Sequence, residues 1–522
     1  MRLNEVAKLA TGIIAGDNDE FVRGWHEVSL AHTSKPNCCM QETTPKWFPL
    51  LKGGDKRKWF GNLLEVIDFK NNGARLRSTE KAMLRNEALY FKAGIHWNRL
   101  SGGAFYSRKT EVGSIFEDMS PSLFSNETDE KILAFLNSKL GQHFLLFLSA
   151  GWKIEIGQVG GLPINFPSFD TDVDRRAQEA IKIAKYDWNY YETSWDFTTL
   201  PLLSSDQRGA NMAETYAKLR SHWQSITDEM QRLEEENNKI FIDSYGLQDE
   251  LTPEVSIDEI TLTCNPHYRY GGNMTDEERE ARLLSDTMAE FLSYAVGCMF
   301  GRYSLDKPSL VLANQGETLA DYLAQVPEPT FEPDEDNVIP MLDGDWFHDD
   351  VTERFRKFLR VTFGEEHFQE NLRFIETSLG KDIRKYFTKD FYKDHVKRYK
   401  KRPIYWMFSS PKGSFNALIY MHRYNRDTVS VLLDQYVREY KVKLNAQKAA
   451  YERVEISSDA SQGEKTKAIK EIQNINSTIE ELDAWEREVI YPLASQRIEI
   501  DLDDGVKANY PKFGSALKSI GI

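Results

Sequence analysis

Hydrophobic positions recur at helical spacing along several stretches of the chain. In segment 128–149 apolar residues fall three and four apart behind Thr128, which predicts one core helix. Segments 171–245 and 276–303 show the same pattern and predict further helices. Two more stretches, 428–455 and 465–490, flank a Ser-, Asp- and Gly-containing break at 457–463. They predict an antiparallel helical hairpin whose second arm carries a coiled-coil-like seam.

The first 170 residues have a different pattern. Short apolar runs are interrupted by turn signals such as Lys52-Gly53-Gly54-Asp55, which predicts mixed strands and short helices. Trp152–Ile156 alternates like a strand, and the longest apolar run, Phe144–Ala150, is expected in the core. A Pro- and acid-rich stretch at 326–344 predicts a linker.

These elements predict an α+β, multidomain protein, because 522 residues exceed what one compact core accommodates. We expect a mixed α/β domain, a mainly helical domain, a linker and a helical C-terminal domain containing the hairpin. Their expected bounds are 1–170, 171–325, 326–344 and 345–522, with the hairpin at 428–490.

Composition narrows the class of protein. The 81 acidic and 66 basic residues give a net charge of −15, so any nucleic-acid surface has to be a local patch. The four cysteines, Cys38, Cys39, Cys264 and Cys298, form neither a disulfide framework nor a metal knuckle. With no membrane-spanning run and no signal peptide, we expect a cytoplasmic protein without membrane association.

Motifs for catalysis and metal binding are missing. The sequence has no HExxH, GxGxxG, GxxxxGK[ST] or GxSxG, and its histidines are scattered, so we assign no metal and no catalytic residue. Asn265-Pro266-His267-Tyr268 is similar to the Asn-Pro-Pro-Tyr loop with which amino-methyltransferases hold a flipped base. The second proline is replaced by His267, and no glycine loop for a cofactor precedes the motif. We interpret it as a turn that begins at Asn-Pro.

Basic clusters are more informative. Lys381–Arg402 holds ten Lys and Arg against three Asp, interleaved with aromatic residues. Its lysines suit contacts with a phosphate backbone. Its aromatic residues are as compatible with packing in the protein core as with a part in DNA binding. A second, Gly-flanked cluster places Lys46, Lys52, Lys56, Arg57 and Lys58 in a loop. Arg99 and Arg108 flank the Gly102-Gly103 turn, within reach of base edges. The candidate DNA-binding residues are Lys52, Lys56, Arg57, Arg99, Arg108, Lys393, Lys397, Arg398, Lys400, Lys401 and Arg402.

An ordered set of short motifs resembles one family. The N-terminal motifs are similar to the target-recognition region of type IIG, single-chain adenine-specific DNA methyltransferases. The later motifs narrow the resemblance to the PglX family of BREX-1 phage-defence systems. The stretches that carry it are Thr11-Gly12, Ala15–Phe21, Lys46–Pro49 with Lys52-Gly53-Gly54, Gly94–Trp97, Leu136–Leu140, Gly157–Ile164, Asn265–Gly272, Gly301–Asp306 and Arg402–Ser410.

The resemblance implies sequence-specific DNA recognition by the C-terminal part of an adenine-N6 methyltransferase, with residues 1–170 as target-recognition domain. The family uses S-adenosylmethionine, but its cofactor loop and Asn-Pro-Pro-Tyr motif are absent here, so we expect no cofactor and no methyl transfer in this chain alone. Expected partners are double-stranded DNA, an N-terminal methyltransferase domain, and other BREX proteins or a phage DNA mimic. Two alternatives stay open: an intact enzyme with a degenerate motif at Asn265, and a non-catalytic interaction scaffold.

Overall fold

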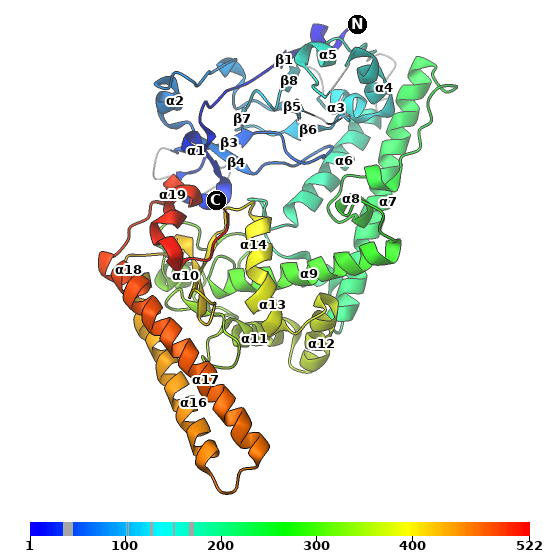
Figure 1. Ribbon diagram of the computed structural model, residues 1–522. Helices are drawn as coiled ribbons and strands as arrows, with labels where there is room; N and C mark the ends of the chain where they lie inside the picture. Colours follow the sequence, from blue (N-terminus) through cyan, green and yellow to red (C-terminus); the bar gives the residue numbers. More distant parts are fainter. Residues whose placement is uncertain are drawn as a thin grey trace. The chain divides into compact units, whose positions relative to one another are not determined.

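The computed structural model describes residues 1–34, 45–100, 102, 104–125, 129–149, 152–165 and 172–521 (Figure 1). The chain forms two compact units. Unit 1 comprises Met1–His26 and Leu30–Leu284, and unit 2 comprises Glu27–Ser29 and Ser285–Ile522. Helices dominate and the strands form small sheets, which confirms the predicted α+β class. No helix among the described residues is both long and apolar enough to cross a bilayer.

Unit 1 is built on two small sheets. The first is antiparallel, in the order β1-β8-β5-β6, and pairs His96 with Arg108. The second has the order β2-β4-β3-β7, with β3 parallel to β7. Apolar side chains between these strands, including Phe21, Ile67 and Phe116, form a continuous core. The strands are β1 (Ala7–Ala10), β2 (Val22–Gly24), β3 (Trp47–Leu51), β4 (Glu65–Asp68), β5 (Gly94–Trp97), β6 (Ser107–Thr110), β7 (Ile115–Phe116) and β8 (Ser122–Ser125).

Helices of unit 1 confirm the prediction for 171–245, where α6 and the long α7 lie. The helices are α1 (Asn18–Phe21), α2 (Lys70–Arg77), α3 (Asp129–Asn137), α4 (Lys139–Leu148), α5 (Ile156–Gly160), α6 (Asp172–Asn189), α7 (Met212–Tyr245) and α8 (Pro266–Arg269). Short 3₁₀ turns connect them at Leu3–Glu5, Trp25–Glu27, Leu30–His32, Glu87–Leu89, Pro201–Leu203, Ser205–Gln207 and Ile257–Glu259.

The prediction of a single helix at 128–149 is wrong, because the helix is interrupted between α3 and α4. Asn137 exchanges hydrogen bonds with the backbone of Ser107 at 3.1 Å in both directions, which ties the end of α3 to β6. Ser138 is extended, and its hydroxyl accepts the amide of Gly141 as the cap of α4. A Cβ on Gly141 would lie 2.3 Å from the Phe135 carbonyl, so the tight turn requires glycine there.

Two neighbouring predictions also need correction. Leu146, Phe147 and Leu148, expected in the core, are exposed; Ala150 lies outside the described residues. The strand predicted at Trp152–Ile156 is reduced to one bridge between Lys153 and Leu100. It ends because a capping box between Glu155 and Gln158 starts α5 instead.

Unit 2 contains a three-stranded antiparallel sheet in the order β10-β11-β9, surrounded by helices. α9, whose residues up to Leu284 belong to unit 1, confirms the helix predicted at 276–303 and ends before Gly301, whose φ of +73° suits glycine. The strands are β9 (Ile339–Pro340), β10 (Tyr405–Ser409) and β11 (Asn416–Tyr420). The first helices are α9 (Asp276–Met299), α10 (Leu319–Gln325), α11 (Val351–Phe363), α12 (Phe368–Leu379), α13 (Ile383–Tyr386), the π-helical η9 (Phe387–Phe391) and α14 (Tyr392–Arg398).

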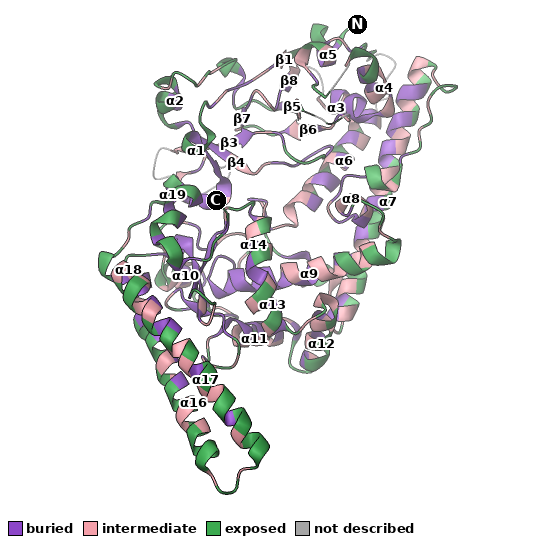
Figure 2. Cartoon of the chain, viewed as in Figure 1, coloured by how far each residue is buried: buried purple, intermediate pink, exposed green. Residues whose placement is uncertain are grey.

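The predicted helical hairpin is present. Its arms are α16 and α17, and a capping box between Ser461 and Glu464 starts the second arm. Leu482 is fully buried in the seam, while the outer faces of both arms are exposed (Figure 2). The remaining elements are α15 (Thr428–Val431), η11 (Leu432–Val437), α16 (Arg438–Ile456), α17 (Gln462–Trp485), η12 (Glu486–Ile490), α18 (Tyr491–Gln496), α19 (Val506–Asn509), and 3₁₀ turns at Met421–Arg423, Leu502–Asp504 and Tyr510–Ala516.

The stretch 326–344, expected to be a linker, lies inside unit 2. Val338 and Ile339 are fully buried, and β9 pairs with β11. The Asn337 side chain bonds both the carbonyl and the amide of Tyr420 at 3.1 Å. The division into domains at 1–170, 171–325, 326–344 and 345–522 stays a prediction.

Candidate nucleic-acid interface

A ladder of lysines follows one helical run of unit 2. α13, η9 and α14 continue directly into one another (Figure 1). Lys385, Lys389, Lys393 and Lys397 lie at four-residue intervals along this run, and all four are exposed. In an α-helix, residues four apart drift around the axis in one direction, because a turn takes 3.6 residues. The wider π turn at η9 drifts the other way, so the lysines stay close to one face. We call these four residues the lysine ladder.

The charge of the ladder is only weakly compensated. Lys385 lies 3.5 Å from Asp382, and Lys393 lies 3.9 Å from Asp390. Both are surface pairs with lysine side chains 74% and 79% exposed, which contribute little to stability. Within the described part of the chain, no carboxylate forms a salt bridge with Lys389 or Lys397. The ladder therefore offers positive charge to solvent.

The aromatic residues of the same run point inward. Tyr386, Phe387, Phe391, Tyr392 and Tyr399 are all buried. Of the two interpretations open for these aromatics, core packing is the one that the structure favours, and they present no surface for stacking on bases.

Hydrogen bonds fix the inner face of the run to its surroundings. His395 is 1% exposed, and its Nε2 accepts the amides of Ile404 and Tyr405 at 3.2 and 3.0 Å, which joins α14 to β10. The hydroxyls of Tyr392 and Tyr510 lie 2.8 Å apart. These bonds hold the inner face of the run, and with it the lysine ladder, against the neighbouring segments.

The residues that follow α14 have mixed roles. Lys400 and Lys401 are exposed and have positive φ angles, and the Lys401 amine donates to the Gly521 carbonyl at 3.1 Å. Arg398 is half-buried. Arg402 pairs at 2.8 Å with Glu27, which is only 1% exposed. Arg402 is thus held in an internal ion pair, while Lys400 and Lys401 extend the exposed charge.

In unit 1, the basic loop Lys52–Lys58 differs from the lysine ladder, because part of its charge is buried. Lys56 is exposed and Lys52 half-buried, but Arg57 is 2% exposed and forms an ion pair with Asp187 of α6. Arg57 also donates to the Phe60 carbonyl at 2.9 Å and to the Thr263 hydroxyl at 2.7 Å. Asp187 in turn accepts the amides of residues 263 and 264.

The next residues of the loop are also bound internally. The Lys58 amine lies 2.5 Å from Glu234 of α7, and the Trp59 indole donates to the same carboxylate at 2.8 Å. Together with the Arg57–Asp187 pair, these contacts attach the loop to α6 and α7. We call Arg57, Lys58, Asp187 and Glu234 the loop clamp.

The two arginines that flank the Gly102-Gly103 turn are also engaged in protein contacts. Arg108 is fully buried and donates to His96, to the Arg57 carbonyl and to Asn98. Burial lowers the pKa of Arg108 to about 9. The guanidinium of Arg99, whose side chain is 23% exposed, binds Glu155 through two nitrogens and also pairs with Asp118. Arg108 is therefore turned into the protein, and Arg99 is held by two carboxylates.

Asn265 has the structural role that we inferred from its motif. It is 1% exposed, accepts the amide of His267 as the cap of α8, and donates to the carbonyls of Ile257 and Ile260. These bonds occupy the amide group that a methyltransferase loop would offer to a target base. The chain reaches this loop through the 3₁₀ turn Ile257–Glu259.

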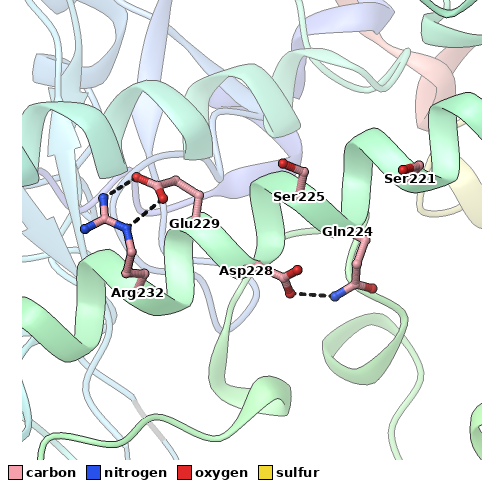
Figure 3. Close-up of a pocket in the computed structure, with 6 residues that line it drawn as sticks. All are labelled: Ser221, Gln224, Ser225, Asp228, Glu229 and Arg232. Atoms are coloured by element: carbon pink, nitrogen blue, oxygen red, sulfur yellow. Dashed lines mark hydrogen bonds and ion pairs between the residues drawn. The ribbon is translucent and has the colours of Figure 1, made fainter.

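A polar depression on α7 is less suited to a ligand. It is lined by exposed or half-buried side chains of this one helix, four of which pair along the helix (Figure 3). Arg232 binds Glu229, and Gln224 donates to Asp228 at 2.7 Å. Among the described residues, no group of three His, Cys, Asp or Glu side chains is placed to hold a metal ion.

Sequence reasoning included Lys393 and Lys397 but missed Lys385 and Lys389. Their spacing could have identified them, because the four-residue interval between Lys393 and Lys397 continues backwards through Lys389 and Lys385. The buried states of Arg57 and Arg108 had no such signal, since both depend on contacts with distant segments.

Comparison with known proteins connects the chain to two methyltransferases. Over 525 residues it is 38% identical to the adenine-specific methyltransferase BrxX of Escherichia coli O9:H4 strain HS, covering 97% of this chain. It is 36% identical over 541 residues to the adenine-specific methyltransferase PglX of Lacticaseibacillus casei strain Zhang, covering 98% of the chain. The chain spans 42% of the length of each relative. No family model matches it. The resemblance to PglX inferred from the motifs is confirmed.

Proposed function

We propose that this chain binds double-stranded DNA as the target-recognition part of a site-specific adenine-N6 methyltransferase of a BREX phage-defence system. The similarity to two adenine-specific methyltransferases along nearly the whole chain supports the enzyme class. The chain then works with a methyltransferase domain that binds S-adenosylmethionine, while residues 1–170 contribute contacts to bases. Asn265, fully engaged in capping α8, takes no part in methyl transfer.

The observation that carries DNA binding is the lysine ladder. Four ammonium groups on one side of a rigid helical run match the repeated negative charge of a phosphate backbone. Lys400 and Lys401 extend this surface beyond the helix. Contacts of this kind position the protein on DNA, and sequence is recognised by other groups that reach the base edges.

Neutralising the ladder tests the proposal. The variant Lys389→Gln/Lys393→Gln/Lys397→Gln should bind a 30-base-pair duplex about 10- to 100-fold more weakly than the wild type at 0.15 M salt, measured by fluorescence anisotropy. Its matched control is Lys465→Gln/Lys467→Gln/Lys470→Gln, which removes the same charge from α17 of the hairpin. Equal losses in both variants would indicate a general effect of net charge, and unchanged binding in the ladder variant would refute the assignment.

A further inference from the structure

The last turn of α4 exposes three consecutive large apolar side chains. Leu146, Phe147 and Leu148 are 69%, 77% and 44% exposed, whereas the preceding Leu145 is buried. Successive residues of an α-helix are spread around its axis, so this turn is apolar on nearly every side. A helix that is apolar all round is normally covered by other protein.

Further exposed apolar side chains lie on the neighbouring segments. The Ser149 hydroxyl donates to the Lys153 carbonyl at 3.3 Å, and Lys153 forms the bridge with Leu100. Trp152 and Leu100 are 76% and 52% exposed. Scattered apolar residues are normal on a protein surface, but several large exposed ones on neighbouring segments, with Trp and Phe among them, are typical of an interface. We define the apolar patch as Leu100, Leu146, Phe147, Leu148 and Trp152.

The patch lies close to residue 1 of the chain. The Met1 amine donates to the Ile164 carbonyl at 3.3 Å, in the segment that follows α5. Within α5, the Gln158 side chain donates to the Leu148 carbonyl at 3.1 Å. A polypeptide joined ahead of Met1 would therefore start beside the patch.

We propose that the apolar patch is the docking surface for the methyltransferase domain. Each relative has more than half of its length outside the region matched here, so a large part of such an enzyme is available to cover this surface. The inference rests on the proposed function, because it takes the occupant to be the cofactor-binding part of the same enzyme. Buried Phe and Trp anchors would supply much of the binding energy of such an interface.

A binding experiment with the intact chain tests the docking. The probe is the part of the Escherichia coli relative that has no counterpart in this chain, expressed separately and accepted only if it unfolds cooperatively. We expect Leu146→Ser/Phe147→Ser/Trp152→Ser to weaken its binding at least ~10-fold in calorimetry. The conservative variant Leu146→Met/Phe147→Leu/Trp152→Phe should retain most of the affinity. The control, Val442→Ser/Ile456→Ser/Ile469→Ser, removes three exposed apolar groups from the hairpin and should have no effect.

Three outcomes would overturn the docking surface. They are equal binding by the serine patch variant, no binding of the folded probe to the wild type, and self-association of the chain that the serine variant abolishes. The last would make a second copy the occupant. DNA binding measured on the same samples separates the two proposals, because patch variants should keep it and ladder variants should keep docking. If docking holds and DNA binding fails, the proposed function fails alone.

Discussion

The loop clamp of unit 1 and the lysine ladder of unit 2 are both basic clusters, yet they use positive charge in opposite ways. In the loop clamp, Arg57 and Lys58 are buried on carboxylates of α6 and α7. In the ladder, lysines at helical spacing stand outside an aromatic core. The difference indicates that a cluster of cations in a sequence offers its charge to solvent only when the backbone repeat directs those cations to one exposed face.

The largest effect should come from opening the loop clamp. Arg57→Met leaves Asp187 buried without its cation, and we expect a loss of about 3–5 kcal/mol in unfolding free energy, measured by urea denaturation. The double variant Arg57→Met/Asp187→Asn should recover part of that loss. A variant that keeps wild-type stability but loses DNA binding would mean that Arg57 contacts DNA, and the comparison would fail.

A smaller, pH-dependent effect is expected at Glu117, next to β7. Burial raises the pKa of Glu117 to about 7, against the opposing charge of Lys52. The folded chain therefore holds this proton more tightly than the unfolded chain, and stability falls as pH rises from about 4.5 to about 7. Glu117→Gln should remove this dependence and stabilise the chain by about 1–2 kcal/mol at pH 8, with no gain near pH 4.5. Thermal unfolding across this range checks it, and a pH-independent difference would contradict the assignment.

Local patterns predicted a large part of the fold. The helices of 171–245, α9 and the hairpin were predictable because their apolar residues repeat at helical spacing over many turns. The break between α3 and α4 was not, because it depends on the contact of Asn137 with Ser107 of β6. The strand predicted at Trp152–Ile156 was wrong for a related reason, since alternation over five residues did not outweigh the capping box at Glu155.

The candidate site could be predicted only in part. Lys393 and Lys397 lie on a face that the sequence defines by itself. Arg57, Arg99 and Arg108 have carboxylate, carbonyl or amide partners that come from segments distant in the sequence, so their burial or pairing becomes visible only in the fold.

The salt dependence of DNA binding tests the central claim most directly. The slope of log K against log salt concentration should become shallower by about 2–3 in Lys389→Gln/Lys393→Gln/Lys397→Gln, because each lost phosphate contact removes about 0.9. The unfolding free energy of this variant should change by less than about 0.5 kcal/mol, since the replaced side chains are exposed. An unchanged slope, with DNA binding intact, would show that the lysine ladder does not contact the phosphate backbone.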